Sequence, residues 1–213
     1  MVEQAVTVRD GQTVLDGVLG ISAAAAGIVL FAHGSGSGRF SPRNRLVAHH
    51  LQQGGIATLL IDLLMKDEED DRRNVFDIDL LADRVLMASA WLRENARTGQ
   101  LALGYFGAST GAGAALQAAA RAPFRIGAIV SRGGRPDLAE RYLPQVTAPT
   151  LLLVGGEDYP VIEMNRQAYQ LLRCPKRLAI IPGATHLFEE PGTLEEVAEQ
   201  ALQWFQEHFT HGA

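Results

Sequence analysis

The sequence has a single cysteine and no long hydrophobic run, and both absences narrow the classes of protein it can belong to. Cys174 is the only cysteine among 213 residues, so the chain forms no internal disulfide, which fits a reducing compartment. The apolar runs are strand-sized and fall well short of the roughly 20 residues that span a bilayer. Residues 1–10 lack the basic and apolar regions of a signal peptide. We therefore expect a cytoplasmic protein with no membrane partner.

Positive charge is also scarce. The chain has 19 Lys and Arg against 24 Asp and Glu, a formal net charge of −5, whereas a nucleic-acid surface needs clustered cations. We therefore predict no nucleic-acid partner. Cys174 has no second cysteine or histidine at a metal-ligand spacing, so we also predict no bound metal. The acidic run 67–71 is followed by Arg72 and Arg73 and is expected to be a solvated loop with local charge pairs.

Length and hydrophobic periodicity predict one α/β domain over residues 1–213. Residues 5–8 and 13–19 are typical of two strands around the Asp10-Gly11 turn, which predicts an N-terminal antiparallel hairpin. Strand patterns then alternate with helix patterns, which predicts a mostly parallel sheet with helices on both faces. The expected strands are 27–32, 56–61, 101–106, 126–131, 150–154 and 177–181, and the expected helices are 42–53, 75–95, 110–121, 161–172 and 194–209. The connection between 131 and 150 holds at most one short helix, near 137–142, which leaves no room for a large cap domain.

A serine stands where catalytic groups of such sheets gather, at the carboxyl end of a strand. Gly107-Ala108-Ser109-Thr110-Gly111 follows the apolar strand 101–106 and precedes an alanine-rich helix. This is Gly-x-Ser-x-Gly in the strand-turn-helix setting that a nucleophile elbow requires. Glycines leave room for a sharp, strained turn, and the helix N-terminus favours developing negative charge. We predict that Ser109 is a nucleophile.

A serine nucleophile needs a base and a group that orients the base, and two later strands end in suitable residues. The strand 150–154 leads into Glu157 and Asp158, and the strand 177–181 leads into His186. The chain order serine, acid, histidine is that of an α/β-hydrolase. Either carboxylate can hold an imidazole N–H. We predict His186 as the base.

The glycine-rich loop 33–38 follows the strand 27–32 and can present backbone N–H groups to an oxyanion. We predict the N–H groups of Thr110 and Ser35 as the donors, with Gly36 as the second choice from the loop. His33 is expected to hold this loop rather than to take part in chemistry.

Three residues near these motifs are candidate substrate contacts. Gly36 lies in the loop, Arg39 lies just beyond it, and Arg132 follows the strand 126–131 directly. A guanidinium at either arginine position can meet an anionic group of a substrate. Solvation at the surface is the alternative for both arginines.

Taken together, these motifs resemble the α/β-hydrolases of the dienelactone hydrolase-like group. The likeness rests on His33-Gly34, the 107–111 elbow, Gly155-x-x-Asp158 and Gly183-x-x-His186, and it covers nearly the whole chain. It implies a small-molecule ester or lactone substrate, an acyl-enzyme and no cofactor, and it places the orienting acid at Asp158. One departure matters: dienelactone hydrolase itself uses a cysteine nucleophile, so a general serine esterase is implied rather than the dienelactone reaction.

Two other functions compete with this interpretation. Gly34-x-Gly36-x-Gly38 follows a strand, and Asp62 ends the next one, which resembles a nucleotide-binding α/β domain. A catalytically idle hydrolase fold that serves as a binding module is the second alternative, because a fold does not establish chemistry. The sequence gives no residue-level argument for an oligomeric state.

Overall fold

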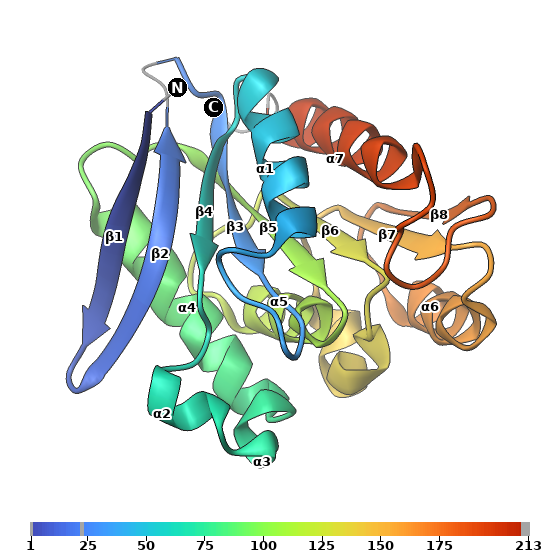
Figure 1. The fold of residues 1–213 in the computed structure, drawn as a ribbon, viewed down its shortest axis with the longest axis horizontal. Coiled ribbons are helices and arrows are strands. Elements are labelled where there is room, and N and C mark those ends of the chain that lie inside the picture. The colour runs from blue at the N-terminus through green and yellow to red at the C-terminus, as the bar shows by residue number, and fades with distance from the viewer. Residues whose placement is uncertain (1, 22–23, 210–213) are drawn as a thin grey trace.

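The computed structural model describes residues 2–21 and 24–209, so Met1, residues 22–23 and the last residues of the predicted domain, 210–213, lie outside the described part. Its centre is an eight-stranded sheet in the order β1-β2-β4-β3-β5-β6-β7-β8 (Figure 1). The strands are β1 (Val2–Asp10), β2 (Thr13–Ile21), β3 (Gly27–Ala32), β4 (Ala57–Ile61), β5 (Ala102–Ala108), β6 (Ala128–Arg132), β7 (Thr150–Gly155) and β8 (Lys176–Ile181).

The sheet is antiparallel at its beginning and parallel from β4 onward. Strands β1 and β2 form a hairpin in which Val2 faces Ile21 and Asp10 faces Thr13, and β2 runs antiparallel to β4. All later neighbours are parallel. Every residue of β3, β4, β6 and β7 is buried, as expected for strands covered on both faces. The predicted fold class, an α/β-hydrolase-type sheet with an N-terminal hairpin, is confirmed.

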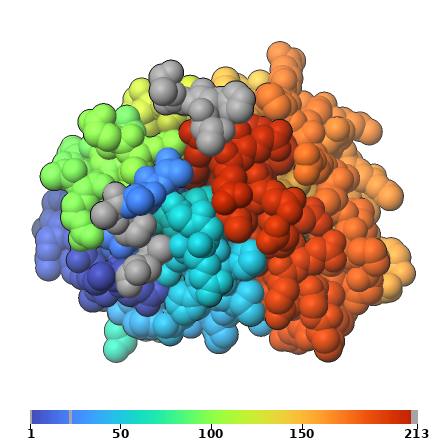
Figure 2. All heavy atoms as spheres, turned by 90° about the horizontal axis from the view of Figure 1, so that it is seen from above, coloured from blue at the N-terminus to red at the C-terminus, as the bar shows by residue number. Residues whose placement is uncertain are grey.

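Helices cover both faces of the sheet. Helices α1 (Pro42–Gln53) and α7 (Thr193–Phe209) lie on one face, while α4 (Ile78–Glu94), α5 (Thr110–Arg121) and α6 (Tyr159–Leu171) lie on the other (Figure 1). Figure 2 shows α1 and α7 side by side on the surface, where His50 Nε2 lies 3.0 Å from Glu199 Oε2. No helix of the described ranges is both long and apolar enough to cross a membrane.

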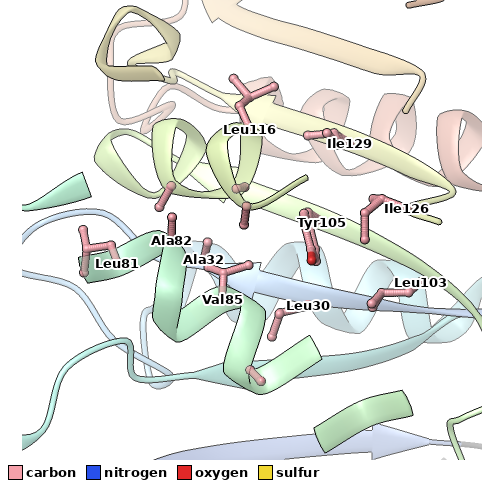
Figure 3. Close-up of a cluster of buried hydrophobic side chains, with 14 of the residues drawn as sticks. Leu30, Ala32, Leu81, Ala82, Val85, Leu103, Tyr105, Leu116, Ile126 and Ile129 are labelled. Carbon is pink, nitrogen blue, oxygen red and sulfur yellow. The ribbon is translucent and has the colours of Figure 1, made fainter. Parts of the chain in front are cut away.

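The core between the sheet and helices α4 and α5 holds β5, the strand that ends just before Ser109, in place. Figure 3 shows Leu30 of β3 and Tyr105 of β5 facing Val85 of α4. Tyr105 is fully buried, and its hydroxyl lies 2.7 Å from Ser89 Oγ, so its polar atom has a partner inside the core. Burying β5 on both faces fixes the position of the turn that follows it.

The segment before α4 differs from the prediction of one helix over 75–95. The Asp77 side chain accepts the Leu80 N–H at 3.0 Å and caps α4, so this helix begins at Ile78. Two short helices precede it, α2 (Lys66–Glu69) and α3 (Arg72–Val75). The expectation of a solvated acidic loop is therefore wrong in part, because Glu68 lies within α2 and contacts Arg84 of α4 at 2.6 Å. The connection after β6 holds the 3₁₀ segment η1 (Pro136–Gln145), which is interrupted by a kink at Ala139.

Candidate active site

Ser109 stands on the sharp turn between β5 and α5. Its backbone has φ 51° and ψ −122°, a conformation that L residues adopt only under strain. The positions on either side of this turn, Gly107 and Gly111, have no room for a side chain. A Cβ at Gly107 would lie 2.4 Å from the Ala112 Cα, and one at Gly111 would lie 2.2 Å from the Ala32 carbonyl oxygen. The residues of the motif therefore allow the strand to pass directly into the helix with the serine at its N-terminus.

Asp158 and His186 are brought together by two turns that are bonded to each other. The Gly156 N–H donates to the Ile181 carbonyl at 2.8 Å, and the Glu157 N–H donates to the Ala184 carbonyl at 2.9 Å. These bonds join the turn after β7 to the turn after β8 through rigid backbone. The relative position of the two side chains is thereby fixed by the sheet.

The acid and the histidine form a short, partly shielded hydrogen bond. His186 Nδ1 lies 2.6 Å from Asp158 Oδ2, and the exposed fractions of the two side chains are 40% and 12%. The alternative acid, Glu157, is exposed and instead accepts the Tyr159 hydroxyl at 3.0 Å. In the neutral imidazole whose Nδ1–H is held by the carboxylate, Nε2 is the nitrogen that can accept a proton.

The end of β6 connects the serine with this acid and histidine pair. The Ser109 N–H donates to the Arg132 carbonyl at 3.2 Å. A Cβ at the next residue, Gly133, would lie 3.6 Å from His186 Cε1. Ser109 follows β5 and His186 follows β8, two strands separated by β6 and β7 in the sheet, and both residues approach the end of β6 at Arg132 and Gly133. Both therefore lie at the carboxyl edge of the parallel sheet, as general rules predict.

The glycine-rich loop packs against the serine. A Cβ at Gly34 would lie 3.0 Å from the Ser109 Cβ. The Ser35 N–H, predicted as an oxyanion donor, donates to Thr110 Oγ1 at 3.1 Å, so it points toward the start of α5. Thr110 is the first residue of α5, where a backbone N–H has no partner within the helix. Gly36, at φ +67°, lies at the exposed tip of the loop.

His33 is buried and fastens the loop to the neighbouring strand end. Its Nδ1 donates to the Gly34 carbonyl at 2.9 Å, and its Nε2 accepts the Leu63 N–H at 2.9 Å. Both nitrogens are used in this tautomer, and burial lowers the pKa of His33 below the ordinary value of 6.5. The ring therefore acts as a neutral connector between two loops.

We expect the stability of the fold to fall at acidic pH through His33. Because the pKa of His33 is lowered in the folded state, the unfolded chain binds the proton more readily. The contribution of neutral His33 to the free energy of unfolding is therefore present above pH 6.5 and is lost as the pH falls below it. His33→Gln keeps an acceptor for the Leu63 N–H without titrating near neutrality. Urea denaturation at pH 8 and pH 5 should show a smaller loss of unfolding free energy for the variant than for the wild type; equal losses would contradict the role given to His33.

Arg39 and Asp62 brace the other end of the loop. Asp62 accepts the Arg39 backbone N–H at 2.6 Å and also its guanidinium, whose second nitrogen lies 3.4 Å from Asp16. Arg39, predicted as a substrate contact, lines the cavity described below, but its charge is already met by two carboxylates. Asp62, the candidate ribose ligand of the nucleotide-binding alternative, is occupied by the same contacts.

A cavity of about 700 Å³ opens beside the loop and the start of α5. Ser35 and Thr110 line it, so it begins at the predicted oxyanion donors. The rest of its lining combines apolar side chains with charged ones, among them Leu64, Val75, Leu81, Arg43, Glu69 and Asp70. Thr110, the residue after Ser109, lines the cavity, whereas Ser109 and His186 do not.

Two residues of the site carry no recognisable sequence signal. Arg43, the second residue of α1, has the pattern of an exposed helix residue but lines the cavity. Glu190 holds the histidine turn, because its carboxylate accepts the Thr185 N–H at 3.0 Å. Neither follows a strand directly, which is the position from which the other candidates were found.

Comparison with known proteins shows the family of the chain. The model of the dienelactone hydrolase family matches residues 15–211. The chain belongs to the dienelactone hydrolase family. A solved dienelactone hydrolase from Anabaena variabilis ATCC 29413 is 58% identical, covers 97% of both chains and superposes with a TM-score of 0.94. Est1E from Butyrivibrio proteoclasticus, at 17% identity, shares the fold over 97% of this chain and 99% of its own with a TM-score of 0.83.

Curated relatives of this dienelactone hydrolase family member have a different name. A protein of Mycobacterium tuberculosis (strain ATCC 25618 / H37Rv) named "Putative phosphoribosyl transferase Rv0571c" is 53% identical over 206 residues. The match covers 97% of this chain but only 46% of that protein. The chain therefore spans about half the length of this relative, and the relative's name applies to a much longer protein.

Proposed function

We propose that the chain is a serine hydrolase that cleaves small carboxylic esters or lactones, with Ser109 as nucleophile, His186 as base and Asp158 as orienting acid. The observation that carries this proposal is the 2.6 Å Asp158–His186 contact beside the strained Ser109 turn. Membership of a hydrolase family supports it.

In the proposed reaction, His186 Nε2 takes the Ser109 proton while the serine oxygen attacks the ester carbonyl. The resulting oxyanion accepts hydrogen bonds from the N–H groups of Thr110 and Ser35, the latter turning from Thr110 Oγ1 toward the substrate. The protonated histidine, stabilised by Asp158, then gives its proton to the leaving alcohol. A water molecule activated by the same histidine attacks the acyl-enzyme, which releases the acid and restores the serine.

The proposal is tested with 4-nitrophenyl esters of increasing acyl length and with a fluorophosphonate probe. We expect turnover of short-chain esters and labelling of the wild type at one serine. Mass spectrometry of the digested, labelled protein should place the adduct on the peptide that contains Ser109. Labelling at another serine, or neither labelling nor turnover, would overturn the proposal.

The alternatives predict different results in the same experiment. A catalytically idle binding module would give no turnover and no adduct. A nucleotide-binding domain would bind nucleotides, but the residue expected to hold the ribose, Asp62, is engaged with Arg39. The phosphoribosyl transferase name of the mycobacterial relative is supported by no feature of the site described above.

A further inference from the structure

Asn165 is a fully buried amide in the interior of α6, about two turns after this helix begins at Asp158. The other buried residues of the helix are Val161, Ile162 and Ala168, which are all apolar. Asparagine is a poor residue for a helix interior, and burying an amide is costly unless it is hydrogen-bonded. Such a departure from the local pattern is expected where a residue serves a function.

The amide of Asn165 donates two hydrogen bonds. Its Nδ2 donates to the Val161 carbonyl at 2.8 Å, within the same helix, and to the Gly134 carbonyl at 3.0 Å, in the segment that follows β6. Its Oδ1 is buried and has no partner among the described residues. The two donated bonds are therefore what this side chain contributes, and one of them leaves the helix.

The segment that receives this bond, residues 132–135, holds the backbone of Ser109 on both sides. The Ser109 N–H donates to the Arg132 carbonyl at 3.2 Å, and the Ser109 carbonyl accepts the Arg135 N–H at 3.0 Å. Gly134 lies between these two anchors. The Arg132 side chain, predicted as a substrate contact, is only 8% exposed and does not line the cavity beside the loop. The contact of Arg132 with the site is therefore made by its backbone.

Helix α6 also carries the proposed acid. The Asp158 carbonyl accepts the Ile162 N–H at 2.9 Å and starts the helix, while the Asp158 carboxylate contacts His186. Helix α6 lies on the same face of the sheet as α5, the helix that begins directly after Ser109 (Figure 1). One side-chain bond, from Asn165, therefore joins the helix that starts at the acid to the segment that holds the serine.

We propose that Asn165 is a positioning residue of the hydrolase, which through Gly134 holds Ser109 at the distance and angle from His186 that proton transfer requires. Asn165 acts through backbone, because both of its donated bonds end on carbonyl groups. A displacement of about 1 Å, caused by a change far from the chemistry, can lower a rate by about 100-fold. This inference deepens the proposed function and rests on it.

The test replaces the amide by an apolar group of similar size. Asn165→Leu should lower kcat for 4-nitrophenyl butyrate by about 10- to 100-fold and leave KM within about threefold of the wild-type value, because the serine is displaced while the cavity is unchanged. The rate of fluorophosphonate labelling should fall by a similar factor. The pH dependence of kcat/KM should keep its wild-type midpoint, because the turns that carry Asp158 and His186 are bonded directly to each other.

Two control variants separate positioning from a general loosening of the structure. Ser131→Ala removes a buried hydroxyl that lies against Gly134 and has no partner in the described part of the chain. Ala168→Gly weakens α6 about one turn beyond Asn165 without removing its hydrogen bonds. Both should keep the wild-type kcat. If urea denaturation shows that Asn165→Leu does not fold, Asn165→Ala, which adds no atom to the core, carries the test with the same expected fall in kcat.

Distinct outcomes overturn the two proposals. If the folded variants of Asn165 keep the wild-type kcat and labelling rate, or if only KM changes, the positioning role is wrong while the hydrolase proposal stands. The positioning role is also wrong if Ser131→Ala and Ala168→Gly lose as much activity as Asn165→Leu. If the wild type neither hydrolyses the ester nor is labelled, the proposed function fails, and the positioning role fails with it.

Discussion

Replacing Ser109 by alanine is expected to lower kcat/KM for a short-chain 4-nitrophenyl ester by roughly 10⁴- to 10⁶-fold, to the level of background hydrolysis. The alanine removes the only atom proposed to bond to the acyl carbon, while the surrounding turn keeps its shape. The measurement is initial-rate kinetics, with circular dichroism to show that the variant is folded. Retention of more than about one per cent of the wild-type activity would exclude Ser109 as the nucleophile.

A second replacement at the same position separates chemistry from strain. Ser109→Gly is expected to be as inactive as Ser109→Ala, but more stable than it by about 1–3 kcal/mol, because glycine adopts the φ of 51° without the strain of a Cβ. Urea denaturation of the two variants measures this difference directly, since both lack the hydroxyl. Equal stabilities would mean that the turn stores no strain.

Gly111→Ala is expected to give the largest loss of stability, about 3 kcal/mol or more in the free energy of unfolding. The new methyl group would lie 2.2 Å from the Ala32 carbonyl oxygen and 2.4 Å from the His33 carbonyl oxygen, and both are backbone atoms that cannot rotate away. Helix α5 and strand β3 would have to move apart. Urea denaturation followed by circular dichroism measures the loss.

The matched control for Gly111→Ala is Gly36→Ala. Gly36 also lies near the site, at φ +67°, but a Cβ there would meet no atom within 4 Å. Gly36→Ala should therefore lower the free energy of unfolding only by the backbone strain, about 1–2 kcal/mol. A loss at Gly111 no greater than the loss at Gly36 would show that the close approach of α5 to β3 does not limit stability.

The sequence predicted well the bounds of several helices and strands and the residues that directly follow a strand. The bounds of β3, α1 and α5 agree with the predicted ones, because each combines a clear apolar pattern with a distinct stop or cap, such as Ser41 before Pro42. The convergence of the carboxyl ends of parallel strands, which needs only the order of elements, predicted His186 and either Glu157 or Asp158. The resemblance to the family then selected Asp158. The catalytic roles of Asp158 and His186 stay predictions.

The features that sequence reasoning missed depend on distances between segments. The helix predicted from Val75 continued an apolar periodicity that Asp77 interrupts by capping α4 at Ile78. The Arg39 charge is met by Asp62 and Asp16, which lie far from it in the sequence. No local pattern encodes such contacts, because the partners are far apart in the chain and meet only after the sheet has formed.

The bonded turns after β7 and β8 have a consequence for the order of events during synthesis. Ser109 is translated well before Asp158 and His186, and the turns that hold the latter two are joined only once β8 has paired with β7. Contacts between distant segments form slowly, and the N-terminal part of a chain leaves the ribosome first. If Ser109 and His186 have the proposed roles, the nascent chain has no base for the serine until residue 186 has been released, and until then the Ser109 hydroxyl is as unreactive as that of any other serine.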